Sequence, residues 1–305
     1  MTRAVAASAG VDWLKKAINL GRDNPGAVFG GAALGLVGAI VAGAGAAALQ
    51  AGLMLGLRNG AGMVLGVVFT TVLMLAVVSM LLVGFLRLID AVENGRPARA
   101  VDVLGGLGDL RASLRVIGFT FLLTLLQYAL LGLVLAVAAR GVLDWYLQVA
   151  MASPETLDPS MMVLPDGLAV ATLLSLVIGL VFYGVQAIGT GQIALRGRGV
   201  FGAIGDGFSG ALRNLPALLV LLLVAIAAVI VAGILMIVAA LLVGLLAQLV
   251  GGWLGVLVGV PLYLGFMLAM WVVACGVAYH LWRDVCGGAA GDDSAVPAEP
   301  AAIGA

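Results

Sequence analysis

Residues 214–282 read NLPALLVLLLVAIAAVIVAGILMIVAALLVGLLAQLVGGWLGVLVGVPLYLGFMLAMWVVACGVAYHLW, a run of 69 positions without Asp, Glu, Lys or Arg. A helix needs about 20 apolar residues to cross the roughly 30 Å hydrocarbon core of a bilayer, so the run is long enough for two crossings. Gln248, Gly251 and Gly252 near its middle supply a polar and turn-forming break. Trp253 follows them and suits the membrane interface. This stretch therefore predicts two membrane-spanning helices.

Four further charge-free runs lie upstream, and each has the length of one crossing. The 305-residue chain is 63% hydrophobic and 10% charged, whereas soluble domains carry about 25% charged residues, so a soluble fold is excluded. The runs do not alternate polar with apolar residues, which excludes β-barrel strands. The predicted fold class is all-α, a polytopic membrane bundle of six helices in three hairpins, with spans at roughly 27–50, 62–86, 116–138, 168–193, 216–246 and 254–281.

The distribution of Lys and Arg predicts the orientation. All of them except Arg58 and Arg140 fall before span one, between spans two and three, between spans four and five, or after span six. The positive-inside rule then places both termini in the cytoplasm of a bacterium, with the protein in the inner membrane. We expect residues 1–285 to form a single membrane domain. Residues 286–305, with few apolar side chains to bury, are predicted to be a disordered cytoplasmic tail.

Each odd-numbered span is preceded by a stretch with helical periodicity. Between residues 11 and 23, charged and apolar side chains occupy opposite arcs of a helical wheel, which is typical of an amphipathic helix in the membrane interface. These stretches predict three cytoplasmic helices that anchor in lipid headgroups or form a collar for a partner, each followed by a hairpin. The repeated stripe comprises Leu14, Ile18, Gly21 and Pro25, then Val103, Leu107, Leu110 and Leu114, then Ile204, Phe208, Ala211 and Leu215.

Three short motifs carry a family resemblance. They are LKKAINLGRDNP at 14–25, NGRP at 94–97 followed by residues 101–114, and IGDGFSGALRNLP at 204–216. Together they resemble a family of uncharacterised bacterial six-span membrane proteins, and the architecture is similar to the membrane domain fused to some glycerophosphodiester phosphodiesterases. The resemblance covers most of residues 11–285 and implies a fold and a membrane location. It brings no catalytic residues, and the phosphodiesterase domain itself is not attached to this chain, so it implies no such activity.

Few polar side chains fall at membrane depth, and they define the candidate substrate-binding site. The predicted spans hold no Asp, Glu, Lys or Arg, which argues against a pump that works through buried carboxylates. Gln127 and Tyr128 lie at the centre of span three, while Tyr183, Gln186 and Thr190 follow helical spacing along span four. Spans three and four form one hairpin, so Gln127 and Gln186 are able to face each other. The cluster is either a substrate site or a set of interhelical hydrogen bonds, each contributing about 0.6–2 kcal/mol.

Other kinds of site are not predicted. Fifteen basic and fifteen acidic residues cancel, which argues against a nucleic-acid partner. His280 is the single histidine, and together with Asp284 and Cys286 it makes a weak metal site without a further ligand. We therefore expect no catalytic residues, no metal and no cofactor.

The resulting functional prediction is a non-catalytic membrane scaffold or partner-binding subunit. The alternative is a passive carrier or channel for a small or lipid-like molecule, which would pass near Gln127, Tyr183 and Gln186. An enzyme that acts on lipid ranks third, because no acid, base or metal set can be assembled for it. The expected partners are the bilayer and either another membrane protein or a second copy of the chain. Stripes of small residues suit tight helix contacts, within one copy or between two, at Gly52, Gly56 and Gly60 and at Gly251, Gly255 and Gly259.

Overall fold

The computed structural model describes residues 2–56, 61–138, 140–142, 144–145 and 165–287, and all elements within these ranges are helical. Six helices are long and apolar enough to cross a membrane, which confirms the predicted six-span α-helical class. They are α2 (Pro25–Gly56), α3 (Ala61–Glu93), α5 (Leu110–Ala138), α7 (Leu168–Arg196), α9 (Leu215–Val250) and α10 (Gly252–Cys286). The shorter elements are α1 (Ala9–Ile18), the 3₁₀ helix η1 (Ala100–Leu104), α4 (Gly105–Gly108) and α8 (Val200–Arg213).

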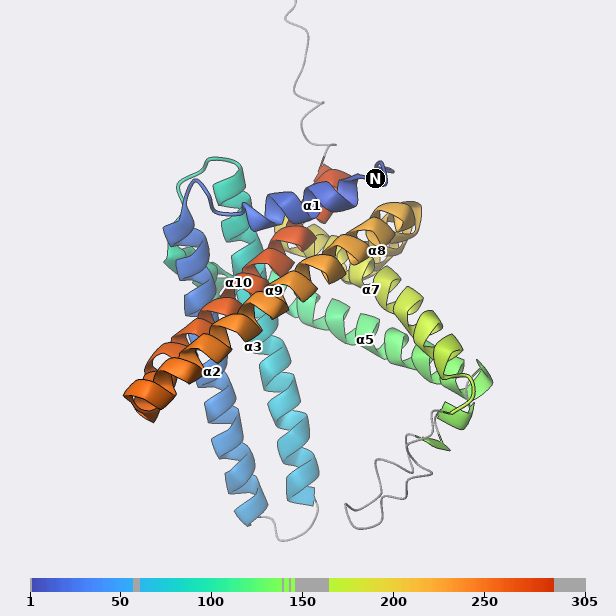
Figure 1. The fold of residues 1–305 in the computed structure, drawn as a ribbon. Helices are drawn as coiled ribbons and strands as arrows, with labels where there is room; N and C mark the ends of the chain where they lie inside the picture. Colours follow the sequence, from blue (N-terminus) through green and yellow to red (C-terminus); the bar gives the residue numbers. More distant parts are fainter. Residues whose placement is uncertain (1, 57–60, 139, 143, 146–164, 288–305) are drawn as a thin grey trace, which may run out of the picture.

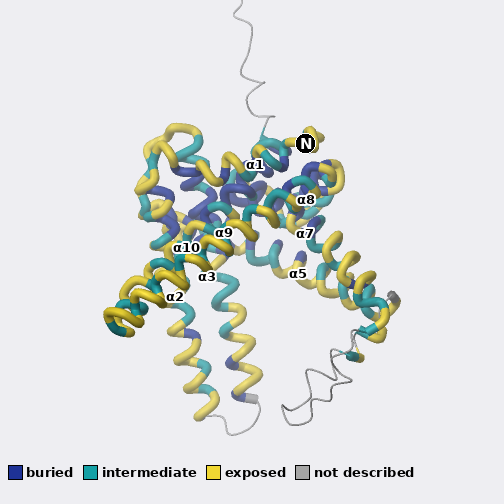
Figure 2. Tube along the Cα trace, viewed as in Figure 1, coloured by how far each residue is buried: buried dark blue, intermediate teal, exposed yellow. Residues whose placement is uncertain are grey.

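The long helices contact one another in consecutive pairs: α2 with α3, α5 with α7, and α9 with α10. The three pairs converge at one end and diverge towards the other (Figure 1). We call the converging end, which carries α1, η1, α4 and α8, the core end, and the opposite helix ends the outer ends. Buried residues gather at the core end, whereas exposed residues cover much of the outer ends (Figure 2). The fold is therefore held together mainly at one end.

Large side chains from five different helices fill the core. Trp13 of α1, Phe85 of α3, Phe119 of α5, Ile188 of α7 and Tyr279 of α10 are all fully buried. Truncating a buried aromatic residue to alanine typically costs about 3–5 kcal/mol, so these contacts account for much of the attachment between the three pairs.

Three of the short elements each pack on one pair of long helices. Helix α8 contacts α7 and α5, η1 contacts α2 and α3, and α1 contacts α10 and α9, the last pair in the chain. The first helix therefore covers part of the last two. The backbone N–H of Arg3 donates a 3.0 Å hydrogen bond to the carbonyl of Val285, so both ends of the described chain lie at the core end.

The apolar side of the first predicted interfacial helix is largely turned towards protein. Within and just after α1, Trp13, Ala17 and Leu20 are buried, and all three belong to the hydrophobic core. Ile18 is exposed. The periodic pattern between residues 11 and 23 therefore marks a helix that docks onto α9 and α10, and this docking accounts for most of its apolar side chains.

The second predicted stripe does not lie on one helix, which corrects the expectation for residues 103–114. Val103 lies in η1, Leu107 in α4, and Leu110 and Leu114 in α5; only Val103 is buried. Asp109 separates α4 from α5. Its Oδ1 accepts a 3.0 Å hydrogen bond from the N–H of Ala112 and so caps the start of α5. The glycines at 105, 106 and 108 further weaken a continuous helix.

Glycine allows η1 and α4 to approach α3 closely. A Cβ atom on Gly84 of α3 would lie 1.8 Å from the carbonyl oxygen of Val103, and one on Gly106 would lie 1.9 Å from the carbonyl oxygen of Met80. The stripes at Gly52 and at Gly255 and Gly259 are looser. A Cβ on Gly52 would meet nothing within 4 Å, and those on Gly255 and Gly259 would make ordinary contacts with α9. The closest backbone approaches thus occur at the core end.

The break predicted inside the long uncharged run is present at Gly251. Its φ of +136° lies in the region that favours glycine, and it separates α9 from α10. With 36 residues, α9 is about 54 Å long at 1.5 Å per residue, well beyond a hydrocarbon core of roughly 30 Å. A helix of excess length fits a bilayer by tilting, which agrees with the divergence of the pairs in Figure 1.

Candidate functional site

Polar side chains join α5 and α7 near the predicted cluster. The amide Nε2 of Gln186 donates to the hydroxyl of Thr120 on α5 and to that of Thr190 on α7, each at 3.3 Å. Thr190 is buried and Gln186 is half-buried. Both hydrogen bonds are at the long end of the usual range, so the cluster ties the two helices together weakly.

The α5 members of the predicted site are not part of this contact. Gln127 is half-buried and Tyr128 is 70% exposed, and neither side chain makes a hydrogen bond to another described residue. Gln186 donates its hydrogen bond to Thr120, which lies seven positions before Gln127, and not to Gln127 itself. The structure thus brings Gln186 and Thr190 together and leaves Tyr128 on the outside of the bundle.

Tyr183 lies on another side of α7, where it lines an apolar cavity of about 570 Å³. Four helices surround this cavity. Small side chains at Ala225, Ala228 and Ala232 follow one stripe of α9 and leave room for it. The remaining lining residues are Leu14 and Ile18 of α1, Leu176, Gly179 and Leu180 of α7, Leu221, Leu222 and Val229 of α9, and Met270, Val273, Ala274 and Val277 of α10.

The cavity has a single hydroxyl in its lining, that of Tyr183. Leu14 and Ile18 of α1 place its nearer side at the core end, and the other lining residues extend it along α7, α9 and α10. Such a lining favours a hydrocarbon chain and offers one hydrogen-bonding group to orient it. The described lining residues include no carboxylate, histidine or lysine.

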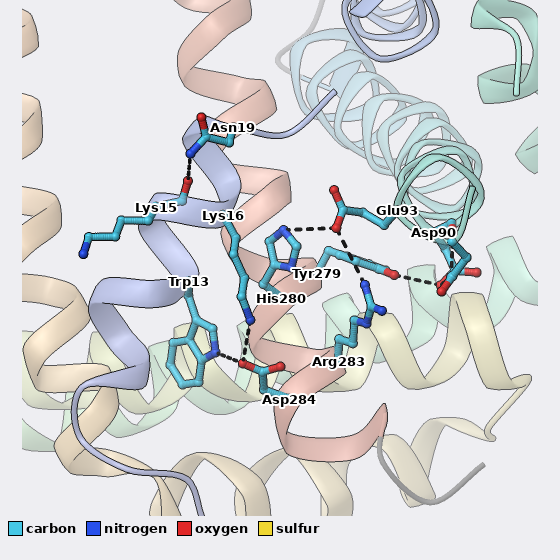
Figure 3. A network of polar contacts seen from close by, with 11 residues as sticks. Trp13, Lys15, Lys16, Asn19, Asp90, Glu93, Tyr279, His280, Arg283 and Asp284 are labelled. Carbon is cyan, nitrogen blue, oxygen red and sulfur yellow. Dashed lines mark hydrogen bonds and ion pairs between the residues drawn. The ribbon is translucent and has the colours of Figure 1, made fainter. Parts of the chain in front are cut away.

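A polar network holds the core end of the bundle (Figure 3). The hydroxyl of Tyr279 on α10 donates a 2.9 Å hydrogen bond to Asp90 of α3. Glu93, one turn further along α3, lies 3.6 Å from Arg283 and 3.9 Å from Nε2 of His280. These contacts join the C-terminal end of α3 to that of α10. Because the carboxylates are occupied by groups of the same chain, the arrangement is typical of a structural network.

A second charged pair connects three helices. Arg87 of α3 lies 2.7 Å from Asp109, and its Nε donates to the carbonyl of Ala194 on α7 at 2.9 Å. Asp109 also accepts the N–H of Ala112 at the start of α5. This backbone hydrogen bond and the Arg87 guanidinium, in that order, hold the pKa of the Asp109 carboxyl below its usual range.

Asp284 and His280, two members of the weak metal site considered from the sequence, each face another group of the protein. Asp284 accepts a 2.9 Å hydrogen bond from the indole of Trp13, and Nε2 of His280 faces Glu93. Over the described part of the chain, His, Cys, Asp and Glu side chains form no group of three that could hold a metal ion.

Comparisons with known proteins identify no relative. No protein-family model matches the chain, and neither a curated protein nor a solved structure is significantly similar to it.

Several residues at these sites were not predicted from the sequence. Thr120 could have been included from the sequence, because it lies seven residues before Gln127 and so falls on nearly the same face of a helix. The pair formed by Asp90 and Tyr279 could not, since 189 positions separate the two residues.

Proposed function

We propose that the protein is a non-catalytic membrane scaffold or partner-binding subunit. The observation that carries this proposal is the divergence of three apolar helix pairs from one packed end (Figures 1 and 2). Several polar groups at that end are engaged with one another, as in the contacts of Asp90 with Tyr279 and of Arg87 with Asp109. The outer ends instead present exposed side chains such as Leu241 and Leu249 of α9. Such flanks suit a lipid bilayer or the helices of another membrane protein.

The proposal includes the bacterial inner membrane as its location and the cytoplasmic side for the core end. Most of the Lys and Arg residues support this orientation. The resemblance to bacterial six-span proteins agrees with it and adds no activity. Reporter fusions after Val285 and in the connection around residue 58 check it: the first should report the cytoplasm and the second the periplasm. The opposite pattern refutes the orientation.

Photocrosslinking in native membranes tests the scaffold function. A photoreactive residue at Leu241, which is exposed at 68%, should crosslink to one protein partner in a constant ratio. Lys15, exposed on α1 at the core end, is the control position and should give no crosslink to that partner. Purification of the chain with lipid alone, and crosslinks to lipid alone at both positions, would refute a partner-binding role.

A second candidate function is supported by the apolar cavity at Tyr183. A passive carrier for a lipid-like molecule requires a place for a hydrocarbon chain, and the stripe at Ala225, Ala228 and Ala232 provides it. The substitution Ala228→Leu should fill this space, whereas Ala240→Leu adds the same volume at an exposed position of α9. If the protein is a carrier, vesicles containing the first variant should move a fluorescent lipid between leaflets more slowly than vesicles containing the second. Equal rates, or no activity in the unmodified protein, argue against a carrier.

A further inference from the structure

The start of α5 and the start of α8 form a surface on which arginine and apolar side chains alternate. Leu110, Arg111, Leu114 and Arg115 of α5 line a hollow of about 600 Å³ together with Val200 of α8. The two arginines are four residues apart, as are the two leucines, so each pair forms one stripe on the helix. A basic stripe and an apolar stripe therefore run side by side along the first turns of a membrane-spanning helix.

The guanidinium groups on this surface keep most of their donors free. Arg111 is exposed and donates no hydrogen bond to any residue that the structure describes. Arg115 donates one, at 2.6 Å, to the carbonyl of Gly197 between α7 and α8, which fixes its position. An arginine carries five N–H donors, so both can still bind an anion in bidentate geometry. Asp109, the carboxylate two positions before Arg111, is engaged by Arg87 and the N–H of Ala112.

The apolar stripe is exposed although it begins a membrane span. Leu110 is 57% exposed and Leu114 is 56% exposed, and Phe201 next to Val200 is 81% exposed. The candidate span of α5 begins at Leu110, so its two leucines lie in the first turns of the apolar segment. Arginine can keep its charged end at the headgroup level there while neighbouring side chains contact acyl chains.

We propose that this surface binds an anionic phospholipid, with the phosphate on Arg111 and Arg115 and an acyl chain along Leu110, Leu114 and Val200. Charge complementarity determines the headgroup, since the free guanidinium donors match phosphate oxygens. A soluble phosphate ion would use the arginines but gain nothing from the leucines. A zwitterionic lipid offers the same phosphate but carries a cation that the arginines repel. The combination selects a lipid with net negative charge.

Lipid binding by the full chain in detergent micelles tests the proposal. The probe is a fluorescent phosphatidylglycerol, and phosphatidylcholine with the same label is the comparison lipid. The double substitution Arg111→Gln/Arg115→Gln should weaken phosphatidylglycerol binding by about 25-fold, since each arginine near an anionic lipid contributes roughly a fivefold gain. The matched control is Lys15→Gln/Arg22→Gln, which removes two exposed cations from elsewhere at the core end and should leave binding unchanged.

Two further measurements separate binding from folding and from other ligands. Arg111→Gln alone leaves the contact of Arg115 with Gly197 intact and should still weaken binding severalfold. Leu110→Ser/Leu114→Ser should weaken binding of a long-chain lipid more than that of its short-chain analogue. Equal losses in the arginine and control variants, equal affinity for both headgroups, or displacement by millimolar inorganic phosphate would each overturn the proposal.

Discussion

The indole Nε1 of Trp13 donates a 2.9 Å hydrogen bond to Oδ2 of Asp284, a residue 271 positions away in the chain. The ring of Trp13 is fully buried against α9 and α10, and Lys16 lies 3.6 Å from the same carboxylate oxygen. This contact fastens the first helix to the last.

Loss of the Trp13 N–H should loosen that attachment. Trp13→Phe retains an aromatic ring but leaves the carboxylate of Asp284 without its indole donor, and should lower the free energy of unfolding by roughly 1.5 kcal/mol. Thermal unfolding in detergent measures the effect. Trp253→Phe, at an exposed position of α10, is the control and should be neutral. Since Trp13 and Asp284 share one interaction, the variants Trp13→Phe and Asp284→Asn should combine with less than additive effect; full additivity contradicts the coupling.

Adding a methyl group where η1 and α4 pack on α3 should be costly. Gly84→Ala and Gly106→Ala place a Cβ 1.8 Å and 1.9 Å from carbonyl oxygens, so backbone segments must separate, at a cost of about 3 kcal/mol. Gly108→Ala is the matched control, because its Cβ would meet nothing within 4 Å, and alanine favours helix. Yield and thermal unfolding of the three variants are the measurements. A Gly84→Ala protein as stable as the unmodified chain would show that the segments are not in close contact.

The two functions of Asp109 can be separated by substitution and pH. Asp109→Asn keeps an acceptor for the N–H of Ala112 but loses the charge that faces Arg87, at a cost of roughly 0.5 kcal/mol. Asp109→Ala also loses the helix cap, which adds about 1 kcal/mol. The lowered pKa of Asp109 means that its charged form is favoured by folding, so its contribution is complete above the ordinary aspartate pKa near 4 and fades as pH falls through the lower folded value. Unfolding temperatures from pH 7 to pH 3 should therefore converge for the unmodified protein and Asp109→Asn at the acid end. A gap that is unchanged at pH 3 contradicts this assignment.

Gln186 and Gln127 should differ although both lie at membrane depth. Gln186→Ala removes the hydrogen bonds to Thr120 and Thr190 and should cost about 1 kcal/mol or less in a thermal unfolding experiment. Gln127→Ala removes no hydrogen bond within the described residues and should be close to neutral. Equal effects of the two substitutions would show that the contact at Thr120 contributes little. If Gln186→Ala were neutral for stability yet abolished lipid movement, the cluster would be a substrate site.

The sequence predicted the class of fold because hydrophobic length is a local property. Uncharged runs longer than about 20 residues mark membrane helices wherever they occur, and the break at Gly251 was visible as a glycine pair inside the longest run. The extent of the helices was less predictable. The predicted span ends at residue 246, whereas helix α9 continues to Val250 and is longer than the bilayer thickness requires.

Long-range contacts could not be predicted from the sequence. Periodicity showed that residues 11–23 have an apolar side, but not that α9 and α10 cover it instead of lipid. The single helix predicted for the stripe at 103–114 is wrong because three glycines and the Asp109 cap divide it, and apolar spacing alone does not detect such breaks. Tyr183 was selected as a polar residue at depth, yet its surroundings are an apolar cavity formed by helices from distant parts of the chain.

The position of α1 has a consequence for biosynthesis. Helix α1 leaves the ribosome before any of the long helices, whereas α9 and α10, on which it packs, leave last. During translation the side chain of Trp13 therefore has no docking surface until the final pair has been inserted. Docking of α1 can thus be completed only after α9 and α10 are in place, and a chain whose synthesis stops after α7 lacks the surface that buries Trp13.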